Sequence, residues 1–150
     1  MKLRIRQSKD LYIARVQDID AVLHLANEQY LKTPYSKGKS KFDHRKVRKV
    51  ISDVITGDQQ ENIILCLAEG ETLVGALGAT TFNPLWNNDL MAAELFFFCK
   101  HLSGVPVLVD AYEEWARSIG CKAITMGLDK SKRRLFKGFV AAEQMYIKEL

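Results

Sequence analysis

Hydrophobic positions divide this chain into segments with helical spacing and segments with the apolar runs of strands. We expect strands at residues 11–15, 62–69, 72–81, 91–99, 121–126 and 143–150. We expect helices at residues 18–31, 42–55, 107–119 and 130–137. The resulting order, β-α-α-β-β-β-α-β-α-β, favours an antiparallel meander with parallel pairing across the helical crossovers. The predicted fold class is α/β (α+β), with a mixed, mostly antiparallel central sheet flanked by helices.

The length and composition of the chain fit one globular domain covering residues 1–150. No apolar run approaches the roughly 20 residues that span a bilayer, and the first residues lack the apolar core of a signal peptide. The cysteines have no metal-ligand spacing, and their odd number argues against a disulfide framework. We therefore expect a cytoplasmic protein without a metal or a membrane partner, and leave its oligomeric state open between monomer and homodimer.

The net charge is +4, and it is unevenly distributed. Residues 36–49 contain seven basic side chains and one acidic side chain, and residues 129–137 contain five and one. Such patches favour anionic partners, although a solvated helix face is the simpler interpretation. The first patch has no interleaved aromatic residue apart from Phe42, which fits the apolar stripe of the helix, so nucleic-acid binding is not expected there.

Residues 91–128 contain a candidate general base and a candidate phosphate-binding turn. Glu94 is the one carboxylate in an apolar strand, where burial raises a carboxyl pKa and suits it to act as a general base. A loop with one glycine, Gly104, then leads into a helix. The first turn of a helix presents backbone N–H groups and a positive dipole end to an anion such as a phosphate.

Residues 93–95 (Ala-Glu-Leu), Gly104 and residues 137–139 (Lys-Gly-Phe) resemble the acetyl-CoA-binding core of the GCN5-related N-acetyltransferase (GNAT) superfamily. The chain looks most like its small phage and bacterial members. The resemblance implies the GNAT fold and acetyl-CoA as co-substrate. In that family a Gln/Arg-x-x-Gly-x-Gly/Ala loop holds the coenzyme's pyrophosphate, and here only Gly104 matches it. His101 stands at its first position and Pro106 at its last.

The resemblance assigns coenzyme binding to Phe97, Phe98, Cys99, His101, Ser103, Gly104, Val105 and Arg133. Backbone N–H groups beside Phe97 and Phe98 would polarise the thioester carbonyl. A Gly104→Glu substitution is expected to block pyrophosphate binding and leave the fold intact.

The resemblance also assigns Glu94 as the base that deprotonates the incoming amine. Strand alternation predicts that Glu94 shares a sheet face with Phe96 and Phe98. The family's acidic Tyr is missing from the helix at 130–137, which leaves Tyr146 as the nearest candidate for a general acid. Tyr35 and Trp86 are candidates to line the acceptor site.

Two functions remain open from the sequence alone. The first is an N-acetyltransferase that passes an acyl group from a coenzyme A thioester to an unidentified amine of a small molecule or protein. The second is a non-catalytic interaction protein on the same fold, which would bind an acidic protein or nucleic acid through residues 37–49. Coenzyme binding separates the two.

Overall fold

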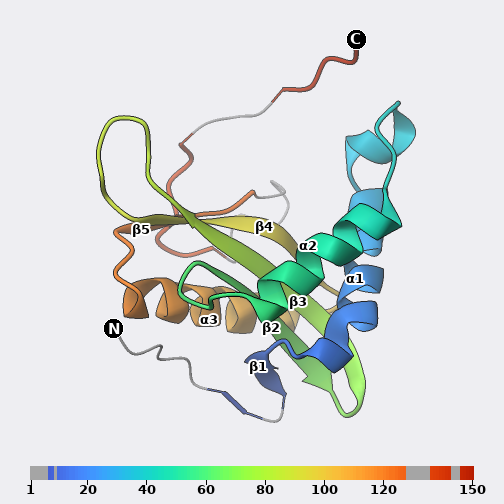
Figure 1. Cartoon of the computed structure of the whole chain (residues 1–150), viewed down its shortest axis with the longest axis horizontal. Coiled ribbons are helices and arrows are strands. Elements are labelled where there is room, and N and C mark those ends of the chain that lie inside the picture. Colours follow the sequence, from blue (N-terminus) through green and yellow to red (C-terminus); the bar gives the residue numbers. More distant parts are fainter. Residues whose placement is uncertain (1–6, 9, 128–135, 143–145) are drawn as a thin grey trace.

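The computed structural model describes residues 7–8, 10–127, 136–142 and 146–150 (Figure 1). The strands are β1 (Leu11–Ile13), β2 (Asn62–Glu69), β3 (Thr72–Phe82), β4 (Met91–Cys99) and β5 (Ala123–Thr125). The helices are α1 (Ile19–Leu31), α2 (His44–Thr56) and α3 (Val105–Ser118), with short 3-10 turns η1 (Val16–Asp18), η2 (Pro34–Lys37) and η3 (Leu102–Gly104). The sequence predicted β2 and β4 with these same bounds.

Within the described residues the strands form one five-stranded sheet in the order β1-β2-β3-β4-β5. Neighbours from β1 to β4 pair antiparallel, whereas β4 and β5 pair parallel because α3 carries the chain across the sheet between them. Helices α1 and α2 cover one face and α3 covers the other (Figure 1). This arrangement confirms the predicted mixed, mostly antiparallel sheet.

A β-bulge interrupts β4. Gly78 of β3 pairs with Phe96 and Ala79 pairs with Glu94, so Leu95 is the extra residue between them. The extra residue reverses the alternation of side chains along the rest of the strand. Glu94 therefore shares the α3 face with Phe97, and the prediction that it faces the same way as Phe96 and Phe98 is wrong.

Glycine at position 78 is explained by this bulge. A Cβ there would lie 2.5 Å from Cε1 of Phe96, so the aromatic ring occupies the space that any side chain would need. A glycine inside a strand is typical of a bulge or of a close approach by another group. The bulge is present, and the close approach is made by a ring.

Trp115 is the largest side chain of the main core, which fills the space between α3 and the sheet. Its ring is fully buried and its Nε1–H donates to the Gln59 carbonyl oxygen at 2.8 Å. Tyr112 is also fully buried, and its hydroxyl donates to the carbonyl oxygen of Thr125 at 3.2 Å, which ties the last residue of β5 to α3. The end of β5, next to Glu94, is thereby fixed.

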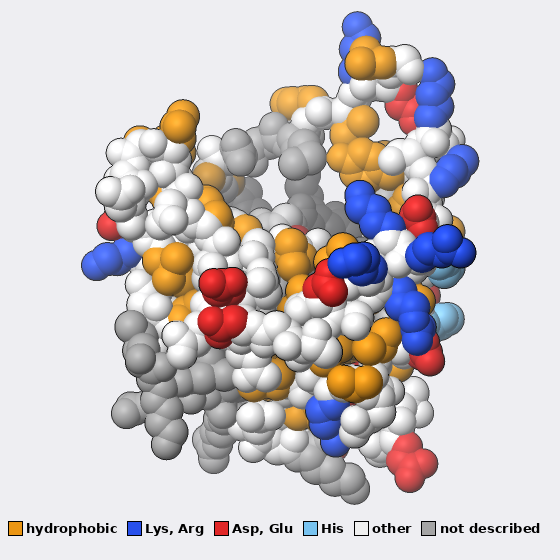
Figure 2. Space-filling view, viewed as in Figure 1, with side chains coloured by type: hydrophobic (Ala, Val, Ile, Leu, Met, Phe, Trp, Pro, Cys, Tyr) orange, Lys and Arg blue, Asp and Glu red, His pale blue; other side chains and the backbone are white. Residues whose placement is uncertain are grey.

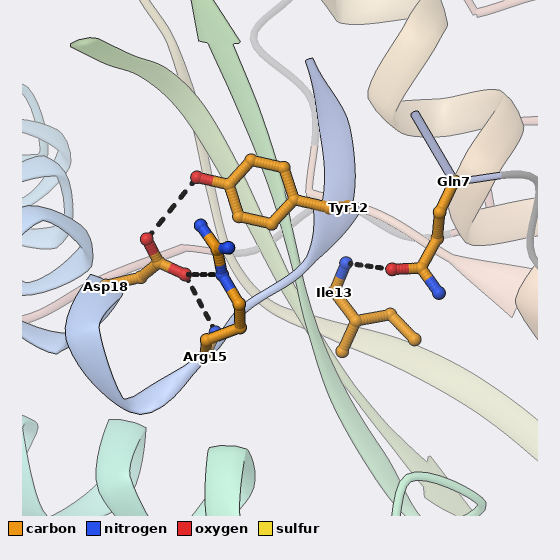
Figure 3. A network of polar contacts seen from close by, with 5 residues as sticks. All are labelled: Gln7, Tyr12, Ile13, Arg15 and Asp18. Carbon is orange, nitrogen blue, oxygen red and sulfur yellow. Dashed lines mark hydrogen bonds and ion pairs between the residues drawn. The ribbon is translucent and has the colours of Figure 1, made fainter. Parts of the chain in front are cut away.

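The start of α1 is held by the buried carboxylate of Asp18 (Figure 3). Its oxygens accept hydrogen bonds from the Arg15 backbone N–H at 2.8 Å and from the Tyr12 hydroxyl at 3.3 Å. The Arg15 guanidinium contacts the same carboxylate and stacks over the Tyr12 ring, 4.6 Å from its centroid. This network joins β1 to α1 and so fixes the direction in which α1 crosses the sheet.

Only parts of the last two predicted elements lie within the described residues. Most of the expected helix at 130–137, including Arg133, lies outside the described residues. Residues 146–150 form no strand, although the sequence predicted one over 143–150. Their end contacts the loop before α2, where Glu149 Oε1 accepts the Lys39 backbone N–H at 2.8 Å.

Candidate active site

β4 and β5 separate beyond the first part of their ladder. They pair only from Met91 to Ala93, whereas β4 continues to Cys99. The bulge at Leu95 lies where the separation begins. Within the described residues, the β5-facing edge of β4 between Glu94 and Cys99 is therefore not part of the parallel ladder, and such an edge can pair with an extended ligand.

Glu94 lies at the opening of this separation. Its Oε1 accepts the backbone N–H of Gly127 at 3.1 Å, just beyond β5. Its Oε2 is buried and has no hydrogen-bond partner among the described residues. Burial raises the pKa of the Glu94 carboxyl, and the hydrogen bond from Gly127 offsets this only in part. The structure thus holds one oxygen of Glu94 in place and leaves the other to accept a proton.

Gln29 contributes a contact that the sequence did not predict. From α1, its side-chain Oε1 accepts the backbone N–H of Phe97 at 3.0 Å. This donor lies next to the bulge on β4, where the resemblance places the N–H groups that polarise a thioester carbonyl. An amide oxygen therefore occupies the position expected for an acyl oxygen.

A signal for Gln29 is nevertheless present in the sequence. Val22, Leu25 and Ala26 form the buried stripe of α1, and Gln29 continues it at helical spacing. A polar side chain on the buried stripe of a helix needs a hydrogen-bond partner, and such a position is a candidate for a role at the site.

The turn between β4 and α3 has fewer free donors than the family's loop. The backbone N–H of Gly104 donates to the His101 carbonyl oxygen at 3.0 Å, and that of Val105 donates to Leu102. Pro106 has no N–H. The two donors that the resemblance assigns to Gly104 and Val105 are therefore already used within the turn.

Gly104 itself is required for packing. It is buried, and a Cβ there would lie 2.6 Å from both Cys99 Sγ and Leu67 Cδ2. A side chain at position 104 must displace the Cys99 and Leu67 side chains, so Gly104→Glu would change packing and charge together and is a poor probe of phosphate binding. Ser103, directly before it, is exposed and offers a better position for a probe of phosphate binding.

The remaining coenzyme candidates are spread around the turn. The His101 ring is half-exposed, and its Nε2 lies 3.5 Å from Glu69 Oε2. Cys99 Sγ donates to the His101 carbonyl oxygen at 3.1 Å, and Phe97 packs with Val105 beneath α3. Phe98 instead faces α1, and Arg133 lies outside the described residues.

A groove of about 600 Å³ leads from the surface between α1 and α2 to the β4 bulge. Tyr35, which the resemblance made a candidate for the acceptor site, is among its lining residues, as is Leu95. Trp86 lies instead on the exposed loop between β3 and β4 and does not line this groove. Tyr146 is 82% exposed on the segment whose end contacts Lys39.

Comparison with solved structures decides the fold. A GNAT family acetyltransferase from Staphylococcus aureus matches 93% of this chain and 97% of its own, with a TM-score of 0.60 and 19% identity. The chain has the GNAT fold. An aminoglycoside acetyltransferase from a soil metagenomic sample, in complex with sisomicin, matches 93% of this chain and 95% of its own (TM-score 0.65, 12% identity). A structure described as a transcriptional regulator from Bacillus halodurans matches 93% and 98% (TM-score 0.66, 16% identity).

No protein-family model matches the sequence, and no curated protein does. The likeness is therefore one of GNAT architecture at low identity, and the chemistry of the site depends on this chain's own residues. No helix in the described part of the chain is both long and apolar enough to cross a membrane. Nor do three metal-ligating side chains come together within the ranges that the structure describes.

Proposed function

We propose that this GNAT-fold protein is an acyl-CoA N-acyltransferase that transfers acetyl from acetyl-CoA to a primary amine. The observation that carries the proposal is Glu94, a buried carboxylate with one oxygen fixed by Gly127 and the other without a partner among the described residues. It lies where β4 and β5 part, beside the backbone donor of Phe97.

β4 supplies a group for deprotonation of the amine and for stabilisation of the oxyanion. Glu94 Oε2 accepts a proton from the amine, directly or through a water molecule, and the freed nitrogen attacks the thioester carbonyl carbon. The Phe97 N–H, once Gln29 has moved away, donates to the developing oxyanion. The tetrahedral intermediate then collapses with cleavage of the C–S bond. As the thiolate leaves, the nitrogen gives up its remaining extra proton to solvent and the thiolate takes one up, since thiols with pKa values near 8.5 are acceptable leaving groups.

Acetyl-CoA is expected to raise the melting temperature of the protein. A ligand that binds only the native state stabilises it by mass action, and a concentration about 100 times Kd should raise Tm by about 5–10 °C in a chain of this size. Differential scanning fluorimetry measures this shift. Its absence at millimolar acetyl-CoA would rule out the coenzyme as a ligand and favour the interaction protein.

The turn at Ser103 can be tested with a matched pair of variants. Ser103→Glu places a negative charge on the exposed turn before α3 and should weaken acetyl-CoA binding by about tenfold, because the coenzyme's phosphates are repelled. Ser103→Gln has nearly the same shape without the charge and should bind close to normally. Equal affinities in the two variants, measured by calorimetric titration, would place the phosphates elsewhere.

Gln29→Met is expected to strengthen the binding of acetyl-CoA by about fivefold. The substitution removes the amide oxygen that competes with the acyl oxygen for the Phe97 N–H, a hydrogen bond worth ~1 kcal/mol. Free coenzyme A has no acyl oxygen and serves as the control ligand, whose affinity should not change. An equal response to both ligands would show that Gln29 does not occupy the acyl position.

A further inference from the structure

The groove between α1 and α2 ends at the reaction centre proposed above. Its lining residues are Ala26, Gln29, Tyr30, Thr33, Tyr35, Phe42, Lys46, Val47, Val50, Ile51, Val54, Ile64, Leu95 and Phe96. Gln29 and Leu95 connect it to the β4 bulge, since Gln29 also contacts the Phe97 N–H and Leu95 directly follows Glu94. An amine at the inner end of the groove would therefore meet a thioester carbonyl held by the Phe97 N–H, with the body of the molecule lying along the groove. Glu94 lies on the opposite face of β4, so it would receive the amine's proton through water.

The lining is apolar and aromatic. Its volume of about 600 Å³ falls in the range of sites that enclose a molecule of drug size. The Tyr30 hydroxyl, the polar end of one lining ring, already donates to the Ser40 carbonyl oxygen at 2.6 Å and holds the loop before α2 against the groove. Most of the groove's surface is apolar, so the body of the acceptor should be apolar.

Charge gives the groove a second preference. Lys46 is the one cationic side chain in its lining, and no Asp or Glu is found among the lining residues that the structure describes. The exposed residues around it are strongly basic, as the Lys and Arg side chains over η2 and α2 in Figure 2 show. Two of these cations are paired, Arg48 with Asp20 and Lys49 with Asp53, whereas Lys46 makes no ion pair within the described ranges. Polycations are repelled here and an anionic group is attracted.

Resting on the acyltransferase function, we propose that the acceptor is a primary amine on an extended apolar or aromatic body that also carries an anionic group. The body fills the groove, the anion pairs with Lys46 and the amine reaches the acyl position at the Phe97 N–H. This chemistry differs from that of the aminoglycoside sisomicin, a polycation without an apolar body, which is bound by one of the fold's other members.

Four amines separate the features of this proposal. Phenylalanyl-phenylalanine has the amine, the apolar body and a carboxylate; its C-terminal amide lacks the anion; glycylglycine lacks the apolar body; spermidine is a polycation. In a free-thiol assay with acetyl-CoA, phenylalanyl-phenylalanine should have a kcat/KM about tenfold above that of its amide. Its kcat/KM should be about 100-fold above that of glycylglycine. Preference for the amide or for spermidine would overturn the proposal.

Lys46 provides the matched test of the anion. Lys46→Glu should reverse the preference between the dipeptide and its amide, and Glu is well tolerated in the first turn of α2, where position 46 lies. Arg45→Glu changes the same net charge at an exposed position outside the lining and should keep the wild-type preference. An unchanged preference in Lys46→Glu would overturn the role of Lys46.

The failure of this proposal can be told apart from failure of the acyltransferase function. Binding of the dipeptide without acetyl-CoA, measured as a rise in melting temperature, reports on the groove alone. If acetyl-CoA binds and the dipeptide does not, only the acceptor class is overturned. If acetyl-CoA does not bind, the acyltransferase function falls, and the acceptor proposal falls with it.

Discussion

Replacing Glu94 by glutamine is expected to lower turnover by about 10²–10⁴-fold at neutral pH, with coenzyme affinity nearly unchanged. The variant keeps the shape of the side chain and removes the oxygen that accepts the proton. Because burial raises the pKa of Glu94, the wild-type rate should rise with pH as this carboxyl ionises. Steady-state kinetics across pH, with an amine that the protein accepts, measures both effects.

The same substitution is expected to stabilise the fold at alkaline pH. A carboxyl whose pKa is raised in the folded state favours folding while it is protonated, and this contribution is lost as pH rises through the folded pKa. Above the pH at which Glu94 ionises, the wild type carries a buried charge that Glu94→Gln does not, and the variant should melt about 2–4 °C higher, equivalent to ~1 kcal/mol. At pH 5 the difference should shrink.

Glu71→Gln is the matched control, since Glu71 is exposed at the turn between β2 and β3. It should change neither turnover nor the pH dependence of the melting temperature. Loss of turnover in Glu94→Gln together with a lower melting temperature at pH 8 would show that Glu94 is a structural residue, not a base.

Trp115→Ala is expected to cost about 3–5 kcal/mol of unfolding free energy, which is at the upper end of the range for a single substitution. Trp115 is fully buried at the centre of the α3 core, and its removal also leaves the Gln59 carbonyl oxygen without its donor. Urea denaturation should show a midpoint shift of this size with little change in m-value.

The chain's other tryptophan supplies the comparison. Trp86 is 81% exposed, so Trp86→Ala should change the unfolding free energy by less than about 0.5 kcal/mol. Because Trp86 does not line the groove, the variant should also leave KM for the amine unchanged. Comparable destabilisation by the two substitutions would contradict the assigned core.

The strands and helices were predictable because their patterns are local. The apolar runs gave β2 and β4 their observed bounds, and helical spacing located α1 and α2 within a few residues. The bulge at Leu95 was not predictable in the same way. One extra residue leaves the composition of the strand unchanged and yet moves Glu94 to the opposite face from Phe96.

The site was predictable only in part, for a related reason. Glu94 stood out because a lone carboxylate in an apolar strand is costly, and the structure places it in a buried position. The role of Gly104 in packing depends on Leu67, which lies far away in the sequence. The groove likewise forms only when α1, α2 and β4 come together, so its lining and the place of Lys46 in it required the structure.

The most direct test of the proposed acyl transfer is to follow the acyl group itself. The protein is incubated with acetyl-CoA carrying a ¹³C-labelled acetyl group and with phenylalanyl-phenylalanine, phenylalanyl-phenylalanine amide, glycylglycine and spermidine together, and the products are analysed by mass spectrometry. We expect a labelled N-acetyl product whose formation is strongly reduced in Glu94→Gln. Two results together would contradict acyl transfer with Glu94 as the base. The label would remain on coenzyme A or appear only as free acetate, and Glu94→Gln would give the same result as the wild type.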